Sequence, residues 1–307
     1  PIHGQYRRPL ISRFTPAAAA ECAPHAREVV NRLIDGFIEG GEADLAQQLT
    51  IPLPAIVNTP VLGIPLEDRD RFQEWAVRLL ASGGEDLEAI GSAMGYFDHL
   101  YEVRRDALGD DIPSLLIGLE IDGKPMDKTQ FILTMIMLMT GGLDTTTNSG
   151  SHMLYYLAEH PEQRRLLVEE PDRIPAAVEE LLRYLTPLPS LFRTAVSSTS
   201  VHGQAIAEGD RVQLCWMAAN HDPAEFNDPD TVDLSRTPNR HFAFGVGEHR
   251  CLGANLARME LRVLLEEALP RLGEYRIVKQ PDRYASVTRG ISHLHAAFPR
   301  GRRYGGS

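Results

Sequence analysis

The segment from Asp127 to His160 constrains the fold most, because it predicts one long uninterrupted helix. Asp127 can cap this helix, Gln130 completes a capping box, and no proline follows before Pro161. At about 1.5 Å per residue the helix would be roughly 50 Å long. Its first half is apolar on nearly every face, which is typical of a helix buried through the middle of a protein.

The middle of this helix is polar where a core helix would be apolar. Residues 140–146 read Thr-Gly-Gly-Leu-Asp-Thr-Thr. Two glycines cost about 2 kcal/mol of helix propensity relative to alanine, and a buried aspartate needs a partner. The segment therefore indicates a functional site on the helix. A close helix crossing marked by glycine is the alternative interpretation.

The rest of the pattern predicts a mainly α protein with small β-sheets. We expect a single domain over residues 1–307, with 300–307 as a flexible tail. Further helices are expected before Phe14, over 16–40, 66–81 and 87–107, and after Cys251 as far as Pro270. Strand-like alternation follows the turn at 208–210, at Val212, Leu214 and Trp216.

Composition excludes several classes of protein. The formal net charge of −11 argues against nucleic acid or an anionic membrane as the main partner. No apolar run is long enough to span a bilayer. Three cysteines cannot form a disulfide framework and have no zinc-site spacing, which favours a reducing compartment and a cytoplasmic location.

The segment 241–253, His-Phe-Ala-Phe-Gly-Val-Gly-Glu-His-Arg-Cys-Leu-Gly, contains the sharpest signal. Glycines at 245, 247 and 253 allow a tight loop around Cys251, and a helix predicted from about Leu252 directs its N-terminus at the sulfur, which favours a thiolate. An electron-rich thiolate suits an axial ligand of haem iron. A buried structural cysteine in a glycine-rich turn is the alternative.

Four segments resemble those of the cytochrome P-450 family. Residues 244–253, Phe-x-x-Gly-x-His-x-Cys-x-Gly, resemble its haem-binding signature, and Gly141 to Thr146 resemble its oxygen-activating motif. Glu180-x-x-Arg183 resembles its Glu-x-x-Arg pair, with Arg236 completing a structural triad. Residues 219–230 resemble the segment that precedes the cysteine loop, although His221 stands where many members have arginine.

The resemblance extends from residue 1 to about 298 and is closest to the soluble bacterial branch. It implies the cytochrome P-450 fold without its N-terminal portion, since the small sheet, helices and substrate-covering loop of the family are not found before His3. We therefore expect an N-terminally truncated chain.

The resemblance also implies site residues. Cys251 would be the axial ligand of haem b, and Asp144 and Thr145 would relay protons as catalytic residues, while the glycine pair lets the helix widen. Haem contacts, including those to the propionates, are implied for His3, Arg7, Gly141, Arg193, Phe244, His249, Cys251 and Gly253. The substrate pocket is expected at Met137, Thr140, Leu191 and Ile291, with segments 188–192 and 287–293 as further candidates for its wall.

The implied activity is hydroxylation of a small to medium apolar organic substrate with O2. Because the chain has no dinucleotide, flavin or iron–sulfur motif, electrons would come from a ferredoxin or flavodoxin with its NAD(P)H-dependent reductase. Arg7, Arg8, Arg13 and Arg250 would offer that donor a docking patch. The alternatives are a truncated haem-binding protein with little activity, a peroxide-driven peroxygenase, and a helical protein without haem.

Overall fold

The capping signals in the sequence determine where the main helices begin. The structure, a computed structural model, describes residues 2–82, 85–285 and 287–304. The side chain of Thr15 accepts a hydrogen bond from the N–H of Ala18 at the start of α2, with Pro16 in the first turn. Asp127 caps α7 through the capping box with Gln130.

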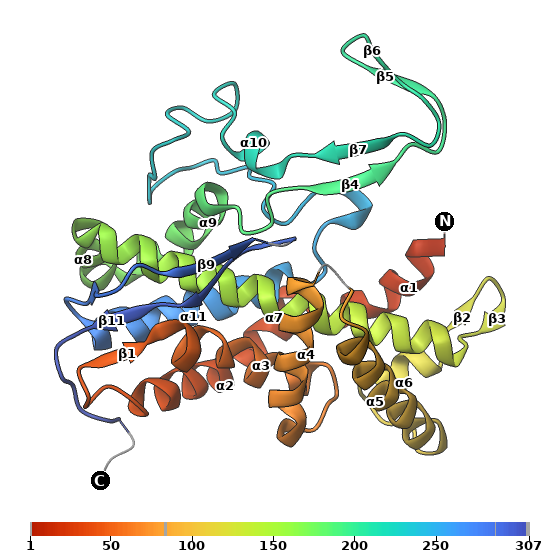
Figure 1. Cartoon of the computed structure of the whole chain (residues 1–307), viewed down its shortest axis with the longest axis horizontal. Coiled ribbons are helices and arrows are strands. Elements are labelled where there is room, and N and C mark those ends of the chain that lie inside the picture. The colour runs from red at the N-terminus through yellow and green to blue at the C-terminus, as the bar shows by residue number, and fades with distance from the viewer. Residues whose placement is uncertain (1, 83–84, 286, 305–307) are drawn as a thin grey trace.

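The helices fill most of the chain (Figure 1). The α-helices are α1 (Ile2–Leu10), α2 (Pro16–Asp35), α3 (Pro52–Val61), α4 (Arg69–Ala81), α5 (Leu87–Asp106), α6 (Ile112–Ile117), α7 (Lys128–Glu159), α8 (Pro161–Glu169), α9 (Ile174–Leu185), α10 (Trp216–Asn220) and α11 (Ala254–Leu272). Shorter helical turns are η1 (Ile11–Phe14), η2 (Ala46–Thr50), η3 (Leu66–Asp68), η4 (Pro171–Arg173) and η5 (Gly247–His249). The mainly α expectation is confirmed.

The strands form small antiparallel sheets rather than one large sheet. Strand β11 (His295–Ala297) lies between β1 (Glu42–Asp44) and β8 (Arg276–Ile277), and β9 (Asp282–Ala285) pairs with β10 (Arg289–His293). The other pairs are β2 (Glu120–Ile121) with β3 (Lys124–Pro125), β4 (Leu191–Thr194) with β7 (Arg211–Leu214), and β5 (Thr199–Val201) with β6 (Gln204–Ile206). In Figure 1 the β4–β7 pair extends away from the helices and has β5 and β6 at its tip.

Helix α7 crosses the middle of the molecule, as Figure 1 shows, and the other helices pack around it. It contacts α3, α4, α5, α9 and α11. Helix α11 packs most extensively on α2, where Arg27 forms ion pairs with Glu266 and Glu267. The long buried helix predicted from the sequence is therefore present, over the expected range.

Some local expectations differ from the structure. Trp216 begins α10 instead of ending a strand, because β7 stops at Leu214. The expected tail is described as far as Tyr304, whose N–H donates to Asp35 and whose ring stacks on Arg271, while residues 305–307 lie outside the described part. Within the described residues, no helix combines the length and the apolar character that a membrane span requires.

Candidate active site

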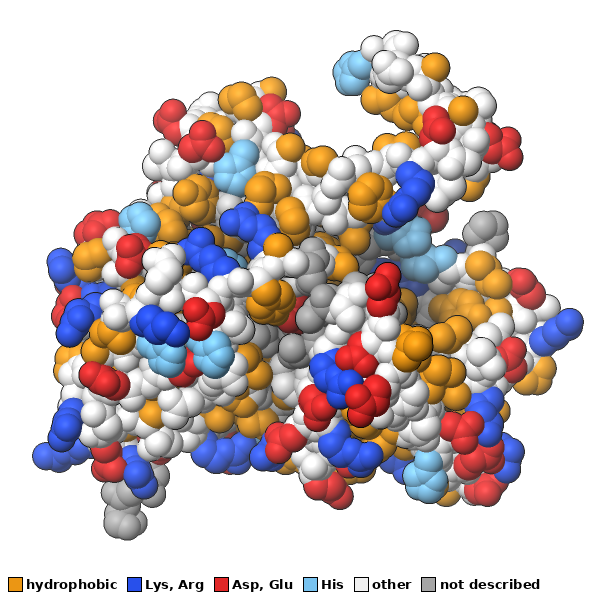
Figure 2. Space-filling view, in the orientation of Figure 1, with side chains coloured by type: hydrophobic (Ala, Val, Ile, Leu, Met, Phe, Trp, Pro, Cys, Tyr) orange, Lys and Arg blue, Asp and Glu red, His pale blue; other side chains and the backbone are white. Residues whose placement is uncertain are grey.

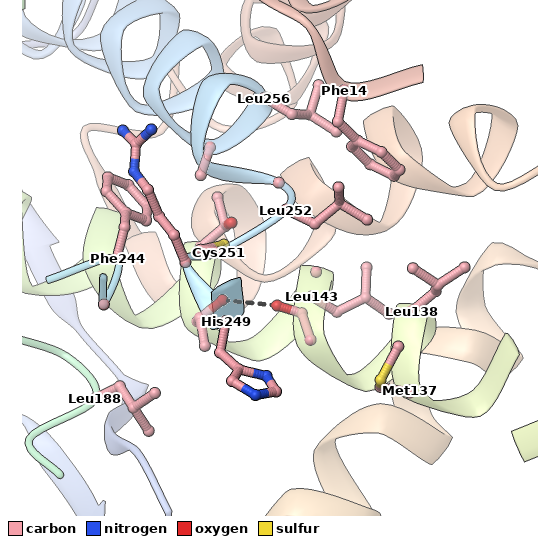
Figure 3. A pocket seen from close by; sticks show the side chains of 18 of the residues that line it. Phe14, Met137, Leu138, Leu143, Leu188, Phe244, His249, Cys251, Leu252 and Leu256 are labelled. Atoms are coloured by element: carbon pink, nitrogen blue, oxygen red, sulfur yellow. Dashed lines mark hydrogen bonds between the residues drawn. The ribbon is translucent and has the colours of Figure 1, made fainter. Parts of the chain in front are cut away.

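A cavity of about 770 Å³ lies between α7, the loop that carries Cys251, and the N-terminal helix α1. Its volume is within the range of about 300–1,000 Å³ that small-molecule and cofactor sites occupy. Figure 3 shows Met137, Leu138 and Leu143 of α7 on one side of the cavity and Cys251 and Leu252 on the other. The wall is predominantly apolar, so the cavity can take an apolar ligand.

The loop before α11 is shaped by glycines. Gly245 and Gly247 have φ values of 65° and 71°, a region that favours glycine. The N–H of Cys251 donates to the carbonyl of Phe244 at 2.7 Å, and Gly245 donates to Phe242 at 2.8 Å. These bonds fix the backbone that leads to the thiol, whose side chain is open to the cavity.

The environment of the thiol differs from the sequence expectation that the helix N-terminus favours a thiolate at Cys251. Burial raises the pKa of Cys251, and the N–H of Gly253 and the charges of Arg7, Arg258 and Arg250 only partly oppose this. Burial therefore dominates over the local dipole. A coordinating thiol is deprotonated by the bound metal cation itself, so the raised pKa is compatible with a metal ligand.

The Phe244 ring is held in this loop by a partly buried ion-pair network. The guanidinium of Arg258 stacks on the Phe244 ring at 4.4 Å and donates to Glu179 at 2.7 and 2.8 Å. His241 also donates to Glu179, at 3.1 Å. Burial would raise the pKa of Glu179, but the bonds from His241 and Arg258 outweigh it and lower that pKa to about 2.

Cationic and imidazole side chains gather at the rim of the cavity. The rings of His3 and His249 lie 4.2 Å apart, and Arg7 donates to the carbonyl of Arg250. Arg193, on β4, lines the same cavity. All eight residues expected to contact haem line it: His3, Arg7, Gly141, Arg193, Phe244, His249, Cys251 and Gly253.

These residues fit a haem. A Cβ added at Gly141 or Gly253 would meet no atom within 4 Å, so open space lies against the backbone on α7 and beside the cysteine loop. An apolar cavity suits the macrocycle, the thiol suits its iron, and the arginines suit its two carboxylates.

One face of α7 borders the cavity. Met137, Gly141 and Thr145 follow one another at four-residue spacing on this face. Thr140 does not line the cavity, which corrects its expected place in the substrate pocket, and its hydroxyl donates to the carbonyl of Ile136 at 2.9 Å. The expected widening at the glycine pair is also absent, because residues 140–146 remain regular α-helix.

Asp144 points away from the cavity, although it was expected beside Thr145 as a proton relay. Its side chain is 1% exposed and does not line the cavity. Tyr284 donates to one carboxylate oxygen at 2.7 Å, and Thr288 and Asn148 donate to the other at 2.6 and 2.9 Å. Gly290 gives the Tyr284 ring room, since a Cβ there would lie 2.0 Å from it.

The segment that contains Ile291 packs behind α7 and not around the cavity. Ile291 is 1% exposed, and its N–H donates to Asn148 at 3.4 Å. Of the described residues in 287–293, none lines the cavity, so the expectation of a pocket wall there is wrong. Leu188 and Leu191, in contrast, do line it.

Glu180, Arg183 and Arg236 come together in the interior. Glu180 and Arg183 are fully buried and form two bonds, at 2.8 and 2.9 Å. Arg236 donates to both oxygens of Glu180 at 3.1 Å. Arg183 also donates to the carbonyls of Asn220 and Pro229, at 2.7 and 2.8 Å, so this cluster ties α9 to the segment before the cysteine loop.

Sequence reasoning missed a polar pair at the base of the cavity. Glu260 on α11 is 1% exposed, and burial raises its pKa to about 8 against a smaller opposing effect of Asn58. Asn58, on α3, donates to the carbonyl of Gly142 at 3.0 Å. An acidic residue inside the apolar repeat of α11 was the signal that could have revealed this pair.

Comparison with known proteins shows the family to which this chain belongs. The family profile described as Cytochrome P-450 matches residues 70–273. Linalool 8-monooxygenase of Pseudomonas putida is 33% identical over 97% of this chain and 76% of that protein. Mycinamicin IV hydroxylase/epoxidase of Micromonospora griseorubida is 37% identical over 90% and 72%. The structure of a mutant of P-450 EryK in complex with erythromycin B has a TM-score of 0.91 and 31% identity over 100% and 81%. The chain therefore belongs to the cytochrome P-450 family and is a haem-dependent monooxygenase.

Proposed function

We propose that this protein hydroxylates a small to medium apolar organic substrate, with haem b held by Cys251 and electrons from a separate donor. The apolar cavity that opens onto the Cys251 side chain carries the proposal, since it offers room for cofactor and substrate next to one thiol. When bound, the haem would supply the chemistry that reduces O2 with electrons from the donor. One oxygen atom would be inserted into a C–H bond of the substrate, and the other would leave as water.

The protein would bind and orient the cofactor for this reaction. Gly253 and Gly245 would let the loop lie close to the cofactor, and the backbone N–H of Gly253 lowers the pKa of Cys251 against the effect of burial. Arg7 and Arg193, both on the cavity wall, would pair with the haem carboxylates.

Thr145 is the hydroxyl best placed to hold a proton or a water molecule at the cavity. It donates to the carbonyl of Gly141 at 3.0 Å in this structure, which leaves its oxygen able to accept. We propose Thr145 as a catalytic residue and Asp144 as the group that supplies protons from behind the helix through water and the Tyr284 hydroxyl.

The substrate class follows from the wall of the cavity. Aliphatic groups line the wall at Met137, Leu138, Leu188 and Leu191. Burial of apolar substrate surface against them stabilises the complex by about 25 cal/mol per Å². We expect selectivity for substrate shape more than for charge.

The electron donor would be a ferredoxin or flavodoxin with an NAD(P)H-dependent reductase. Arg8 and Arg250 are exposed on the cysteine side of the cavity and suit an acidic partner. Arg13 contributes less to this patch than the sequence suggested, because it forms an ion pair with Asp110.

The test compares Cys251→Ser with Cys215→Ser in haem-loaded protein. Cys215 is also exposed but does not line the cavity, so it is a matched control. We expect the absorbance of the reduced, CO-treated protein to lose its thiolate signature in Cys251→Ser alone, and alkaline pyridine to identify the haem as type b. A thiolate signature that survives in Cys251→Ser would remove the basis of the proposal.

The substrate class is tested separately, by titrating apolar compounds against the wild-type spectrum. Binding beside the iron changes its spin state, and bound compounds are then incubated with O2, NADH and a ferredoxin system. Product formation with peroxide but not with the ferredoxin system would favour the peroxygenase alternative.

A further inference from the structure

A carboxylate and two imidazoles converge on the far side of the fold from the cysteine loop, where β1 meets β10 and β11. Asp44 lies opposite His295 in the antiparallel β1–β11 register, and His293 precedes His295 by two residues. Side chains two residues apart in an extended segment share a face. Figure 2 shows histidine side chains next to each other on the face where Figure 1 has β1 and β11. None of the three residues lines the cavity.

The three side chains direct nitrogen and oxygen atoms at one point. One oxygen of Asp44 is 2.6 Å from Nδ1 of His293 and 3.9 Å from Nε2 of His295. The three ligand atoms all lie within 4.8 Å of one another, and the two rings are nearly parallel, at 6° with centroids 5.9 Å apart. An arrangement of this kind presents three lone pairs to one ion.

The carboxylate is fixed before any ion arrives. Its Oδ1 accepts hydrogen bonds from the N–H groups of Ala46, Gln47 and Leu294 at 3.1, 3.3 and 2.9 Å. These bonds leave Oδ2 to face the imidazoles. Hydrogen bonds to the second oxygen of a ligating carboxylate are the usual support of a metal site.

The donor set selects the kind of ion. Imidazole nitrogens favour zinc, copper and nickel, whereas magnesium and calcium prefer oxygen ligands alone. Zinc–nitrogen and zinc–oxygen bonds of about 2.0–2.2 Å put neighbouring ligands of a tetrahedral ion about 3.3 Å apart. The side chains of His293 and His295 are 44% and 40% exposed, so small rotations can close the remaining gap.

We propose that Asp44, His293 and His295 form a zinc site, with water as the fourth ligand. It joins β1 to strands that lie some 250 residues later in the chain, since Asp44 and His293 are 249 positions apart. Because an ion that binds only the folded chain stabilises it by mass action, zinc clamps the two ends of the sequence together. The site is independent of the monooxygenase chemistry.

The experiment uses the haem-loaded chain, freed of any purification tag and treated with EDTA. Zinc chloride is titrated by calorimetry into the wild type and into His293→Ala, His295→Ala and Asp44→Asn. The amide introduced by Asp44→Asn would keep Oδ1 as an acceptor for the three N–H groups and replace the ligand oxygen Oδ2 by an uncharged NH2 group. His99→Ala is the matched control, because His99 is exposed on α5. Magnesium chloride tests selectivity.

We expect the wild type and His99→Ala to bind one zinc ion that the three cluster variants bind at least about tenfold more weakly. Zinc should raise the thermal midpoint of the wild type, but not that of Asp44→Asn. An unchanged spectrum of the reduced, CO-treated protein shows that each variant is folded. If the wild type binds no zinc, or all three variants bind zinc as tightly as the wild type does, the proposal is overturned and the cluster is a His293–Asp44 ion pair only.

Discussion

Tyr284→Phe tests the hydrogen bonds that hold Asp144 behind the central helix. The phenol donates to Asp144 at 2.7 Å, while Thr288 and Asn148 occupy the other oxygen. Both carboxylate oxygens accept hydrogen bonds, as an ionised group requires. The substitution removes one of the three charge-assisted hydrogen bonds to Asp144. It leaves the aromatic ring and its packing against Gly290 unchanged.

The magnitude follows from the charge of the acceptor. A hydrogen bond to a charged group contributes about 1.5–3 kcal/mol, and one to a neutral group about 0.5–1.5 kcal/mol. Tyr275 is the matched control, because it is 1% exposed and donates at 2.7 Å to the neutral carbonyl of Leu154. We therefore expect Tyr284→Phe to lower the free energy of unfolding by about 1 kcal/mol more than Tyr275→Phe does.

The assay is urea denaturation of the haem-loaded variants, with Asp144→Asn and the double variant Asp144→Asn/Tyr284→Phe included. The two single changes act on one bond, so the cycle should give a coupling energy of about 1 kcal/mol or more. Equal losses for Tyr284→Phe and Tyr275→Phe, together with additive effects in the cycle, would refute the idea that Tyr284 holds the charge of Asp144.

Three further outcomes are expected. Thr145→Ala should bind haem and substrate normally but yield less product per NADH oxidised, with more peroxide released; unchanged coupling would leave Thr145 as a packing residue. Glu260 has a pKa of about 8 in the folded chain, against an ordinary value of 4.5. As pH rises between these values, the unfolded chain loses this proton before the folded chain does. The free energy of unfolding therefore falls, by up to about 1.4 kcal/mol per pH unit. In Glu260→Gln, the urea midpoint should no longer fall with pH across this range. A pH profile identical to that of the wild type would contradict the raised pKa of Glu260. Glu180→Gln leaves Arg183 buried without its carboxylate and should cost about 3–5 kcal/mol in denaturation experiments; a loss below about 1 kcal/mol would mean that the carbonyls around Arg183 suffice.

The features that sequence predicted best depend on local chemistry. The start of α7 follows from Asp127 and Gln130, which are three residues apart and cap the helix without help from the rest of the fold. The cysteine loop follows from glycines at 245 and 247, whose positive φ values few other residues adopt. Both features could be predicted from residues that are close together in the sequence.

The errors concern residues whose place depends on distant partners. Thr140 was assigned to the cavity because it lies three residues after Met137 and one before Gly141, but it does not line the cavity, and its hydroxyl donates to the carbonyl of Ile136. Ile291 was assigned there too, but the pairing of β9 with β10 turns it onto Asn148, 143 positions earlier in the chain. Periodicity does not fix which of two buried faces a residue joins.

The separation of Asp144 from Thr145 follows from the geometry of the helix that carries both. Consecutive residues of an α-helix differ by about 100° around its axis, so the side chains of Asp144 and Thr145 leave the helix in different directions. Thr145 lines the cavity, and Asp144 therefore lies toward β9 and β10, where Tyr284 and Thr288 bind it. A proton that passes between the two side chains therefore has to move around the helix backbone. If Asp144 supplies protons to Thr145, as we propose, the bond from the Tyr284 hydroxyl to Asp144 places the β9–β10 pair beside the proton path, in addition to its role as a cover for the helix.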